Sequence, residues 1–138
     1  MSETIRGRTG KKVIYVAMAY RGKTVFDVHC NIHLAWLAAA EIWALGAVAL
    51  CPHTNSQHMT GLVDDQVFLD GDIDLMLRCD AVYMGPGWQR SAGAVHERQV
   101  AADHGLAVFE DLEALGRFCR APVAAAAAVE GAGLGAGR

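Results

Sequence analysis

The sequence predicts an α/β fold, in which a small doubly wound parallel sheet of four to five strands has helices on both faces. Four short apolar runs recur along the chain, and each is followed by a segment with helix signals, which gives the order β-α-β-α-β-α-β-α. The first run is continuous and rich in β-branched residues, as in strands that are buried on both faces. Such alternation produces a parallel sheet with right-handed crossovers.

The predicted strands are the apolar runs, which are bounded by turn residues. They comprise residues 13–18, 47–51, 81–84 and 106–109. Pro52 ends the second strand because proline cannot donate a hydrogen bond to a neighbouring strand. Residues 52–64 then form a long polar loop without periodicity. A loop of that length in a compact domain is more often functional than a plain connector.

Each predicted helix follows a strand and begins after a capping residue. The helices span residues 32–45, about 70–78, about 92–104 and about 112–119. Their N-terminal caps are Asn31, either Asp70 or Asp72, Ser91 and Asp111. Gly46 and Gly105 end the first and third helices, because glycine readily adopts the left-handed conformation that stops a helix.

Length and composition indicate one compact domain of 138 residues with enough apolar side chains, 53%, to build a core. We expect a flexible leader at residues 1–12, a single domain at 13–120 and a disordered Ala- and Gly-rich tail at 121–138. Residues 1–12 lack the hydrophobic run and cleavage site of a signal peptide, so we expect none, and the longest apolar stretch, residues 34–50, is interrupted and too short to span a bilayer. The sequence therefore predicts a cytoplasmic protein without a membrane partner.

Charge and cysteine content exclude several other classes of protein. The net charge is −3 and the lysines and arginines are scattered, which is unlike a protein that binds duplex nucleic acid. The four cysteines are far apart and form no CxxC pair, so we expect buried thiols rather than disulfides. Histidines and cysteines cluster at residues 29–33 and 51–58, but loop histidines usually make hydrogen bonds, so we expect neither a metal nor a cofactor.

The most informative stretch is Ser91-Ala-Gly-Ala-Val-His-Glu97, which follows the loop Gly85-Pro-Gly-Trp88. The start of a helix binds anions because its first N–H groups have no partners within the helix. Glu97 lies one to two turns into this helix, and the small residues Gly93 and Ala94 leave open space before it. The pattern indicates a small-molecule site, although a surface glutamate on an amphipathic helix would give the same pattern.

Other candidate residues lie in the strands and loops that reach the same edge of the predicted sheet. Tyr15 lies in the middle of the first strand, where its hydroxyl needs a partner, either a carboxylate or the backbone. Arg21 follows that strand and could meet an anion held near Ser91, or it could simply be solvated. Asp72 could be a cap or a surface charge, and Trp88 could stack on a ligand or cover its own loop. Ligands of such sheets bind at the carboxyl ends of the strands.

In order and spacing, these motifs resemble the nucleoside 2-deoxyribosyltransferase superfamily, including its 2′-deoxynucleoside 5′-phosphate N-hydrolase branch. Within that superfamily the chain looks most similar to uncharacterised phage and bacterial relatives. The resemblance covers residues 13–109. It is carried by Ile14-Tyr15, Ala19-Tyr-Arg-Gly22, Gly71-Asp72 eight residues before Cys79-Asp80, and Ser91-x-Gly-x-x-x-Glu97.

The resemblance implies a role for each matching residue. Glu97 matches the carboxylate that attacks the anomeric carbon, Asp72 the carboxylate that assists departure of the base, and Tyr15 the tyrosine that hydrogen-bonds the nucleophile. Ser91 and Arg21 match the groups that hold a 5′-phosphate in the hydrolase branch. Further substrate-binding residues are expected at Tyr20, Gly22, Gly93 and Trp88.

The function expected from this resemblance is cleavage of the N-glycosidic bond of a nucleoside or nucleoside 5′-monophosphate through a covalent glycosyl-Glu97 intermediate, with hydrolysis favoured over base transfer. The resemblance also implies a homo-oligomer, a dimer or larger. An alternative is a non-catalytic nucleotide-binding module on the same fold. A flavodoxin-like or Rossmann-like cofactor protein is disfavoured, because no GxGxxG follows the first strand.

Overall fold

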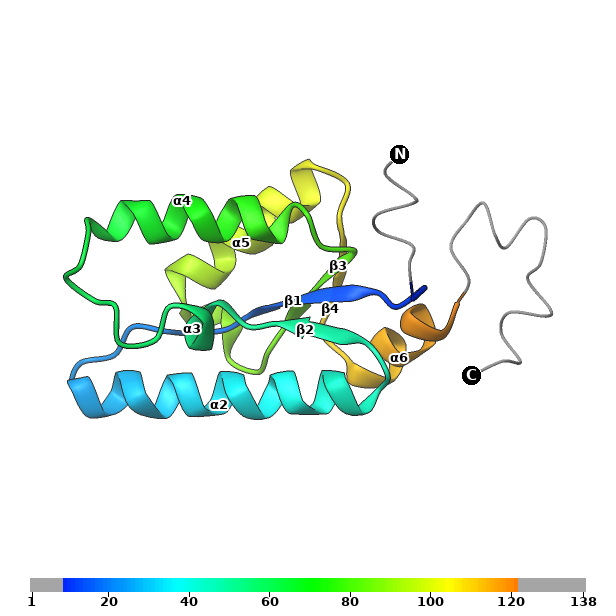
Figure 1. The fold of residues 1–138 in the computed structure, drawn as a ribbon, viewed down its shortest axis with the longest axis horizontal. Coiled ribbons are helices and arrows are strands. Elements are labelled where there is room, and N and C mark those ends of the chain that lie inside the picture. The colour runs from blue at the N-terminus through cyan, green and yellow to red at the C-terminus, as the bar shows by residue number, and fades with distance from the viewer. Residues whose placement is uncertain (1–8, 122–138) are drawn as a thin grey trace.

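A four-stranded parallel sheet forms the centre of the molecule (Figure 1), in a computed structural model that describes residues 9–121. The strands are β1 (Val13–Ala17), β2 (Val48–Leu50), β3 (Ala81–Met84) and β4 (Ala107–Phe109). They pair in the order β2-β1-β3-β4. The prediction of a small parallel sheet is confirmed. The predicted leader and tail lie mostly outside the described residues.

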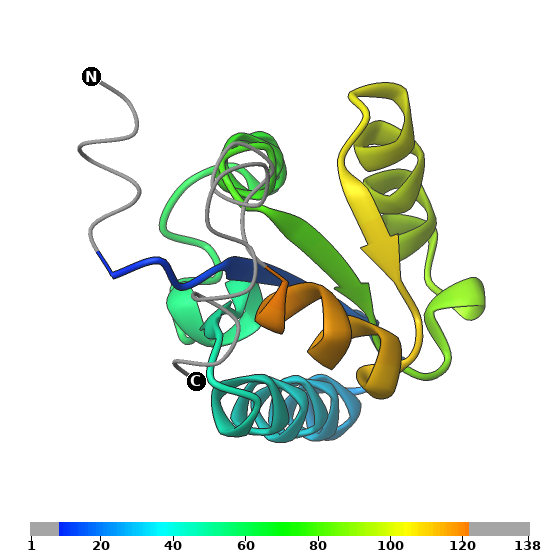
Figure 2. The same ribbon diagram turned by 90° about the vertical axis from the view of Figure 1, so that its right-hand side faces the viewer.

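Helices cover both faces of the sheet, as predicted (Figure 2). Helices α2 (Val25–Ala44) and α6 (Leu112–Arg120) pack on one face, and α4 (Asp65–Met76) and α5 (Ala92–Asp103) pack on the other. Successive side chains of a strand point to opposite faces. Ile14 and Val16 of β1 therefore belong to the core under α2, whereas Tyr15 and Ala17 belong to the core under α4 and α5.

Helix α2 begins seven residues earlier than the sequence predicted, so the assignment of Asn31 as its cap was wrong. The cap is Thr24, whose hydroxyl accepts a hydrogen bond from the Asp27 backbone N–H at 3.1 Å. The Asp27 carboxylate in turn accepts one from the Thr24 N–H at 3.1 Å. This reciprocal capping box satisfies two N–H groups at the first turn. Asn31 lies inside the helix, where its side-chain amide donates to the carbonyl oxygen of Tyr20 at 3.0 Å.

Helix α4 also begins earlier than predicted, because Asp64 rather than Asp70 or Asp72 caps it. The Asp64 carboxylate accepts a hydrogen bond from the Gln66 N–H at 2.9 Å. Asp70 and Asp72 consequently lie within the helix. The predicted loop at residues 52–64 is also interrupted, since the short helix α3 (Pro52–Asn55) follows β2 directly. Proline is favourable in the first turn of a helix, where its missing N–H is not needed.

The predicted caps of the last two helices are confirmed. The hydroxyl of Ser91 accepts a hydrogen bond from the Ala94 N–H at 3.1 Å and begins α5, and the carboxylate of Asp111 caps α6. A single 3-10 turn, η1 (Trp88–Arg90), precedes Ser91. Among the described residues, no helix is long and apolar enough to cross a membrane.

The amino edge of the sheet is tied to the C-terminal end of α6 through Lys12, a residue of the predicted leader. Its side chain is buried, and the ammonium group donates to the carbonyl oxygens of Phe118 at 2.7 Å and Ala121 at 2.5 Å. These carbonyls belong to the last turn of the helix, where no further N–H groups are available to them. Lys12 therefore caps α6 from a distant part of the sequence.

Candidate functional site

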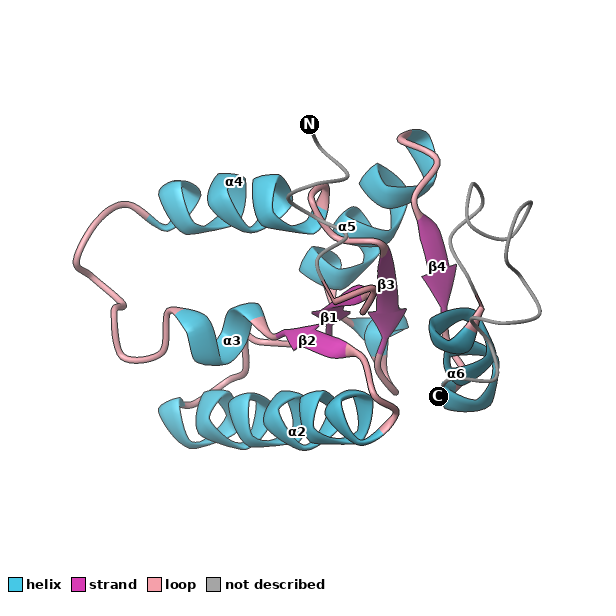
Figure 3. Cartoon of the chain, turned by 45° about the vertical axis from the view of Figure 1, so that its right-hand side comes forward, coloured by secondary structure: helices cyan, strands magenta, loops and turns pink. Residues whose placement is uncertain are grey.

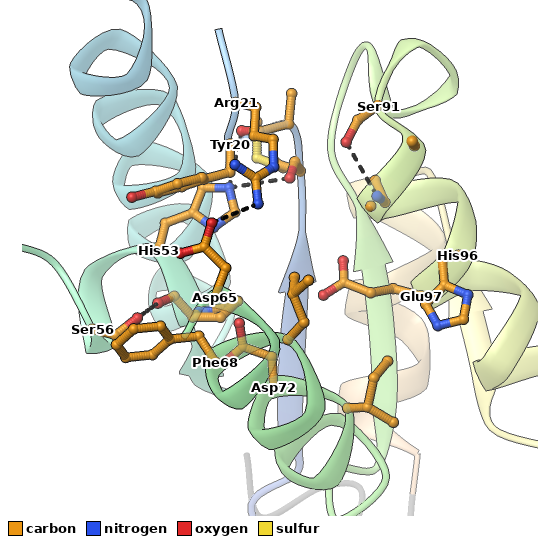
Figure 4. A pocket seen from close by; sticks show the side chains of 18 of the residues that line it. Tyr20, Arg21, His53, Ser56, Asp65, Phe68, Asp72, Ser91, His96 and Glu97 are labelled. Atoms are coloured by element: carbon orange, nitrogen blue, oxygen red, sulfur yellow. Dashed lines mark hydrogen bonds and ion pairs between the residues drawn. The ribbon is translucent and has the colours of Figure 1, made fainter. Parts of the chain in front are cut away.

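A cavity of about 730 Å³ opens at the carboxyl edge of the sheet (Figure 4). Its walls come from the loop after β1, from α3, from α4 and from the start of α5. Figure 3 shows α3 continuing from the end of β2 with α4 running above it, and in Figure 4 the labelled residues of α3 and α4 lie on one side of the site and those of α5 on the other. In the sheet order β2-β1-β3-β4, β2 lies on one side of β1, whereas β3 and then β4 lie on the other side. The strand order therefore reverses between β1 and β3. The cavity therefore lies where ligands of open parallel sheets usually bind.

A short hydrogen bond joins β1 to α5 at the bottom of the site. Tyr15 is completely buried in the sheet, and its hydroxyl donates to the Glu97 carboxylate at 2.6 Å. Ala94 and Ala101 lie on the same side of α5 as Glu97 and are almost completely buried against the sheet. Because these neighbours are small, the helix approaches closely enough for Glu97 to reach Tyr15.

Asp72 faces Glu97 from the other side of the cavity. It projects inward from α4, while Glu97 projects from α5 (Figure 4). Asp65 and Phe68 precede Asp72 by seven and four residues, so all three lie along one side of α4, and all three line the cavity. Met76, one turn beyond Asp72, is fully buried and anchors this side of the helix to the sheet.

Burial changes the protonation of both carboxyl groups. It raises the pKa of Glu97 to about 7, and nearby Asp72 adds to this rise while the hydrogen bond from Tyr15 opposes it. Burial also raises the pKa of Asp72 to about 6. The pKa of Tyr15 is raised as well, first by burial and then by Glu97, so its hydroxyl remains a donor. Because the pKa of Glu97 is the higher of the two, the singly protonated pair holds its proton mainly on Glu97 between pH 6 and 7, and the form with Glu97 ionised and Asp72 protonated is the less populated one.

Four of the predicted substrate-binding residues line the cavity: Tyr20, Arg21, Ser91 and Gly93. The Arg21 guanidinium is paired with the Asp65 carboxylate at 3.3 Å, and both side chains are exposed. This pair connects the loop after β1 with the start of α4. The ring of Tyr20 contacts His53 edge-on, with ring centroids 5.1 Å apart.

The other two, Gly22 and Trp88, are not among the cavity-lining residues, and the structure gives each a different environment. A side chain at Gly22 would overlap Asp27, so glycine is needed there by the capping box of α2. The indole N–H of Trp88 donates to Glu110 at 3.2 Å, and the Arg98 guanidinium lies 5.0 Å from the centre of its ring. The ring and the indole N–H of Trp88 thus contact Arg98 and Glu110.

Residues that the sequence analysis did not assign to the site also line the cavity, among them His53, Phe68 and Arg90. The His53 Nε2 lies 3.1 Å from the Met18 carbonyl oxygen and 2.9 Å from that of Ala19. Burial lowers the pKa of His53, so the imidazole is neutral and donates its one N–H to these carbonyls. Arg90 could have been found from its place directly before Ser91. Among the described residues, no group of three or more histidine, cysteine or acidic side chains could hold a metal ion.

Comparisons with known proteins show the fold and the family. No curated protein matches the chain. A solved structure of a 2-deoxyribosyltransferase from Bacillus psychrosaccharolyticus is similar, with a TM-score of 0.54 and 15% sequence identity, covering 75% of this chain and 90% of that chain. At this identity the likeness shows a shared fold.

A family model described as a domain of unknown function, DUF4406, matches residues 13–110, which run from the start of β1 to just beyond β4 and include Tyr15, Asp72 and Glu97. The match extends over well over half of the chain. The chain therefore belongs to the DUF4406 family.

Proposed function

We propose that this protein cleaves the N-glycosidic bond of a nucleoside or a nucleoside 5′-monophosphate. The observation that carries the proposal is the 2.6 Å hydrogen bond from Tyr15 to Glu97 in a cavity that Asp72 faces from the opposite wall. A retaining glycosidase needs one carboxylate as nucleophile and a second carboxyl group as acid. The fold shared with a 2-deoxyribosyltransferase is consistent with this chemistry.

In the first step the ionised Glu97 attacks the anomeric carbon. The bond from that carbon to the base nitrogen breaks, and its electron pair leaves with the base. Protonated Asp72 supplies the proton that makes the base a better leaving group. Tyr15 holds Glu97 by donating to one carboxylate oxygen, which leaves the other oxygen for the sugar. The product is a glycosyl ester on Glu97.

In the second step water attacks the anomeric carbon of the ester. Asp72, now ionised, accepts a proton from the water, and Glu97 departs as a carboxylate, so that both groups return to their initial states. We favour water over a second base as acceptor, because the residues at Ser91 and Arg21 match those that hold a phosphate in the hydrolase branch of the resemblance.

A 5′-phosphate would bind at the start of α5. Ser91 and the first residues of this helix line the cavity together with Arg90, and the N–H groups at the start of a helix favour anions. Arg21 is occupied by Asp65. A phosphate that recruited Arg21 would therefore have to displace an exposed ion pair, a modest penalty since exposed pairs contribute about 1 kcal/mol or less.

The test is chromatographic detection of base released from a panel of 2′-deoxynucleosides, ribonucleosides and their 5′-monophosphates. Glu97→Gln should lower turnover by at least about a thousandfold, since it removes the nucleophile. Glu113→Gln is the matched control, because Glu113 is an exposed glutamate on α6 away from the cavity. Peptide mass spectrometry after acid quench should detect a pentosyl adduct on the wild-type peptide that contains Glu97.

Release of base at equal rates by wild type and Glu97→Gln would contradict the proposal. If no substrate releases its base but nucleotides still raise the melting temperature, the protein is the nucleotide-binding module considered as the alternative.

A further inference from the structure

We propose that Asn31 and His53 are positioning residues, which orient the loop after β1 so that its backbone N–H groups bind the anion of the substrate. The inference deepens the proposed function and rests on it in taking that anion to be a 5′-phosphate. Neither side chain needs to touch the substrate, because both act on backbone carbonyl oxygens of residues 18–21.

His53 holds the part of the loop where β1 leaves the sheet. The carbonyl oxygen of Ala17, the last residue of β1, still accepts a hydrogen bond from the Gly85 N–H at 3.0 Å. Beyond it, the His53 Nε2 lies 3.1 Å from the Met18 oxygen and 2.9 Å from the Ala19 oxygen. The one N–H of the imidazole is shared between these two acceptors. Both carbonyls therefore turn toward α3, the helix that carries His53.

Asn31 holds the next part of the loop from the second turn of α2. Its side-chain nitrogen lies 3.0 Å from the Tyr20 carbonyl oxygen and 3.2 Å from the Arg21 carbonyl oxygen. A side-chain amide carries two N–H groups, so each carbonyl can receive one of them. Both carbonyls therefore turn toward α2, and no residue of α2 is among those that line the cavity.

The N–H groups of the loop point the opposite way from these carbonyls. In a trans peptide the N–H of one residue is antiparallel to the C=O of the residue before it. The N–H groups of residues 19–22 are thus directed away from α2 and α3, and none of them has a hydrogen-bond partner in the described part of the chain. Three of these residues, Ala19, Tyr20 and Arg21, line the cavity. Successive backbone N–H groups that face one way form a site for an anion.

The start of α5 lies across the cavity from this loop. Figure 4 places Ser91 on the opposite side of the site from His53. A phosphate between the two would be contacted by the N–H groups of the loop and by those at the start of the helix. The Asp65 carboxylate would repel this phosphate, but the Arg21 guanidinium already pairs with it at 3.3 Å.

The first test is a titration of isotope-labelled protein with sodium phosphate at constant ionic strength, followed through the backbone amide signals in NMR spectra. Inorganic phosphate is the probe because it carries neither base nor sugar. The amide signals of residues 19–22 should shift together with those of residues 92–94, with one dissociation constant. Asn31→Ala should raise this constant by about tenfold, because two carbonyls lose their donor. Asn55→Ala, the same change at an exposed asparagine of α3 that does not line the cavity, should leave it unchanged.

Two variants of His53 separate its hydrogen bonds from the packing of its ring. His53→Phe keeps a ring against Tyr20 but has no donor, so it should weaken phosphate binding by about tenfold. His53→Gln loses the ring but keeps an N–H of similar reach, so the dissociation constant should stay within about threefold of wild type. A residue that served only to pack would give the opposite order. The control is His33→Phe, at an exposed histidine of α2 that does not line the cavity.

In the proposed reaction the effect should fall on substrates that carry a phosphate. For Asn31→Ala, the ratio of kcat/KM for a nucleoside 5′-monophosphate to that for the nucleoside should fall by about tenfold. A general loosening of the fold would lower both values in proportion and leave this ratio unchanged.

The proposal is overturned if phosphate shifts no amide signal of residues 19–22 in wild type, or if it shifts only those at the start of α5. Folded Asn31→Ala and His53→Phe proteins that bind phosphate as tightly as wild type also overturn it. Should Asn31→Ala fail to fold, the comparison of His53→Phe with His53→Gln decides alone.

The phosphate titration does not read base release, so its failure is distinguishable from failure of the proposed reaction. Shifts in the loop without base release from any substrate would keep the positioning role and remove the reaction. Base release without shifts in the loop would do the reverse.

Discussion

At Glu97, burial raises the pKa of the carboxyl group and the hydrogen bond from Tyr15 lowers it again in part. The proposed reaction requires Glu97 ionised, with a pKa of about 7, and Asp72 protonated, with a pKa of about 6. The fraction of protein in that state is greatest midway between these values. We therefore expect kcat/KM to follow a bell-shaped pH profile with its maximum between pH 6 and 7.

Tyr15→Phe tests the contribution of this bond. Without the Tyr15 hydroxyl the pKa of Glu97 rises further. The pH optimum of kcat/KM should therefore move to higher pH, and the value of kcat/KM at the optimum should fall by about tenfold for each unit by which the pKa of Glu97 rises. The measurement is kcat/KM from pH 4.5 to pH 9 (about two units on each side of the optimum). Tyr83→Phe, which removes the hydroxyl of a tyrosine in the core under α2 on the other face of the sheet, is the control. An unchanged optimum in Tyr15→Phe would mean that the bond does not set the protonation of Glu97.

The same burial makes Glu97 a source of instability at higher pH. Its pKa in the folded protein is about 7, against an ordinary value of 4.5, so between these values the folded chain holds a proton that the unfolded chain has released. The free energy of unfolding should therefore fall as the pH rises from 4.5 to 7 and stay level above it.

Glu97→Gln removes this titration, so it should stabilise the protein by up to about 3 kcal/mol above pH 7 and by much less near pH 4.5. Urea unfolding at both pH values measures the difference, with Glu113→Gln as the control. An equal effect at both pH values would contradict the raised pKa.

The residues of the site differ in how far the sequence could predict them. Glu97 and Ser91 belong to one helix, and its cap and its small residues can be recognised from neighbouring positions in the sequence. Trp88 could not be placed in this way, because its orientation depends on Glu110, twenty-two residues away. His53 was missed for the same reason, since its partners are carbonyls of the loop after β1.

Among the elements, α2 shows most clearly how one local interaction decides where a helix begins. Thr24 and Asp27 cap it together, and Thr24→Ala should lower the free energy of unfolding by about 1 kcal/mol. Thr9→Ala, at an exposed threonine outside any helix, should have little effect. Denaturant unfolding of both variants measures the difference, and equal stabilities would mean that the capping box contributes nothing to the fold.

The boundaries of elements were the least predictable part of the fold. A Ser, Thr, Asp or Asn before an apolar stretch marks a helix start, but α2 and α4 each offer several such residues. Asn31 and Asp70 satisfy the rule as well as Thr24 and Asp64 do. The first turn of α4 lines the cavity, whereas the start of α2 is determined by the reciprocal hydrogen bonds between Thr24 and Asp27.

For the whole molecule, alternation of strands and helices was sufficient to predict a parallel sheet covered on both faces and a site at its carboxyl edge. The strand order β2-β1-β3-β4 was not predicted, because short apolar runs carry no signal for which strand pairs with which. The exposed side of α2, which carries Phe26, Trp36 and Trp43, shows the same limit. Its apolar residues are equally consistent with a core and with an interface until the structure shows which of them are covered.

The hydrogen bonds from the Lys12 ammonium group to the carbonyl oxygens of Phe118 and Ala121 have a practical consequence for handling the protein. It brings the two ends of the described chain together at the amino edge of the sheet, opposite the cavity. Immobilisation through a group attached at either end would orient the cavity toward the solvent. The same proximity makes the domain suited to circular permutation, in which a short peptide joins these ends and the chain is reopened in an exposed loop elsewhere.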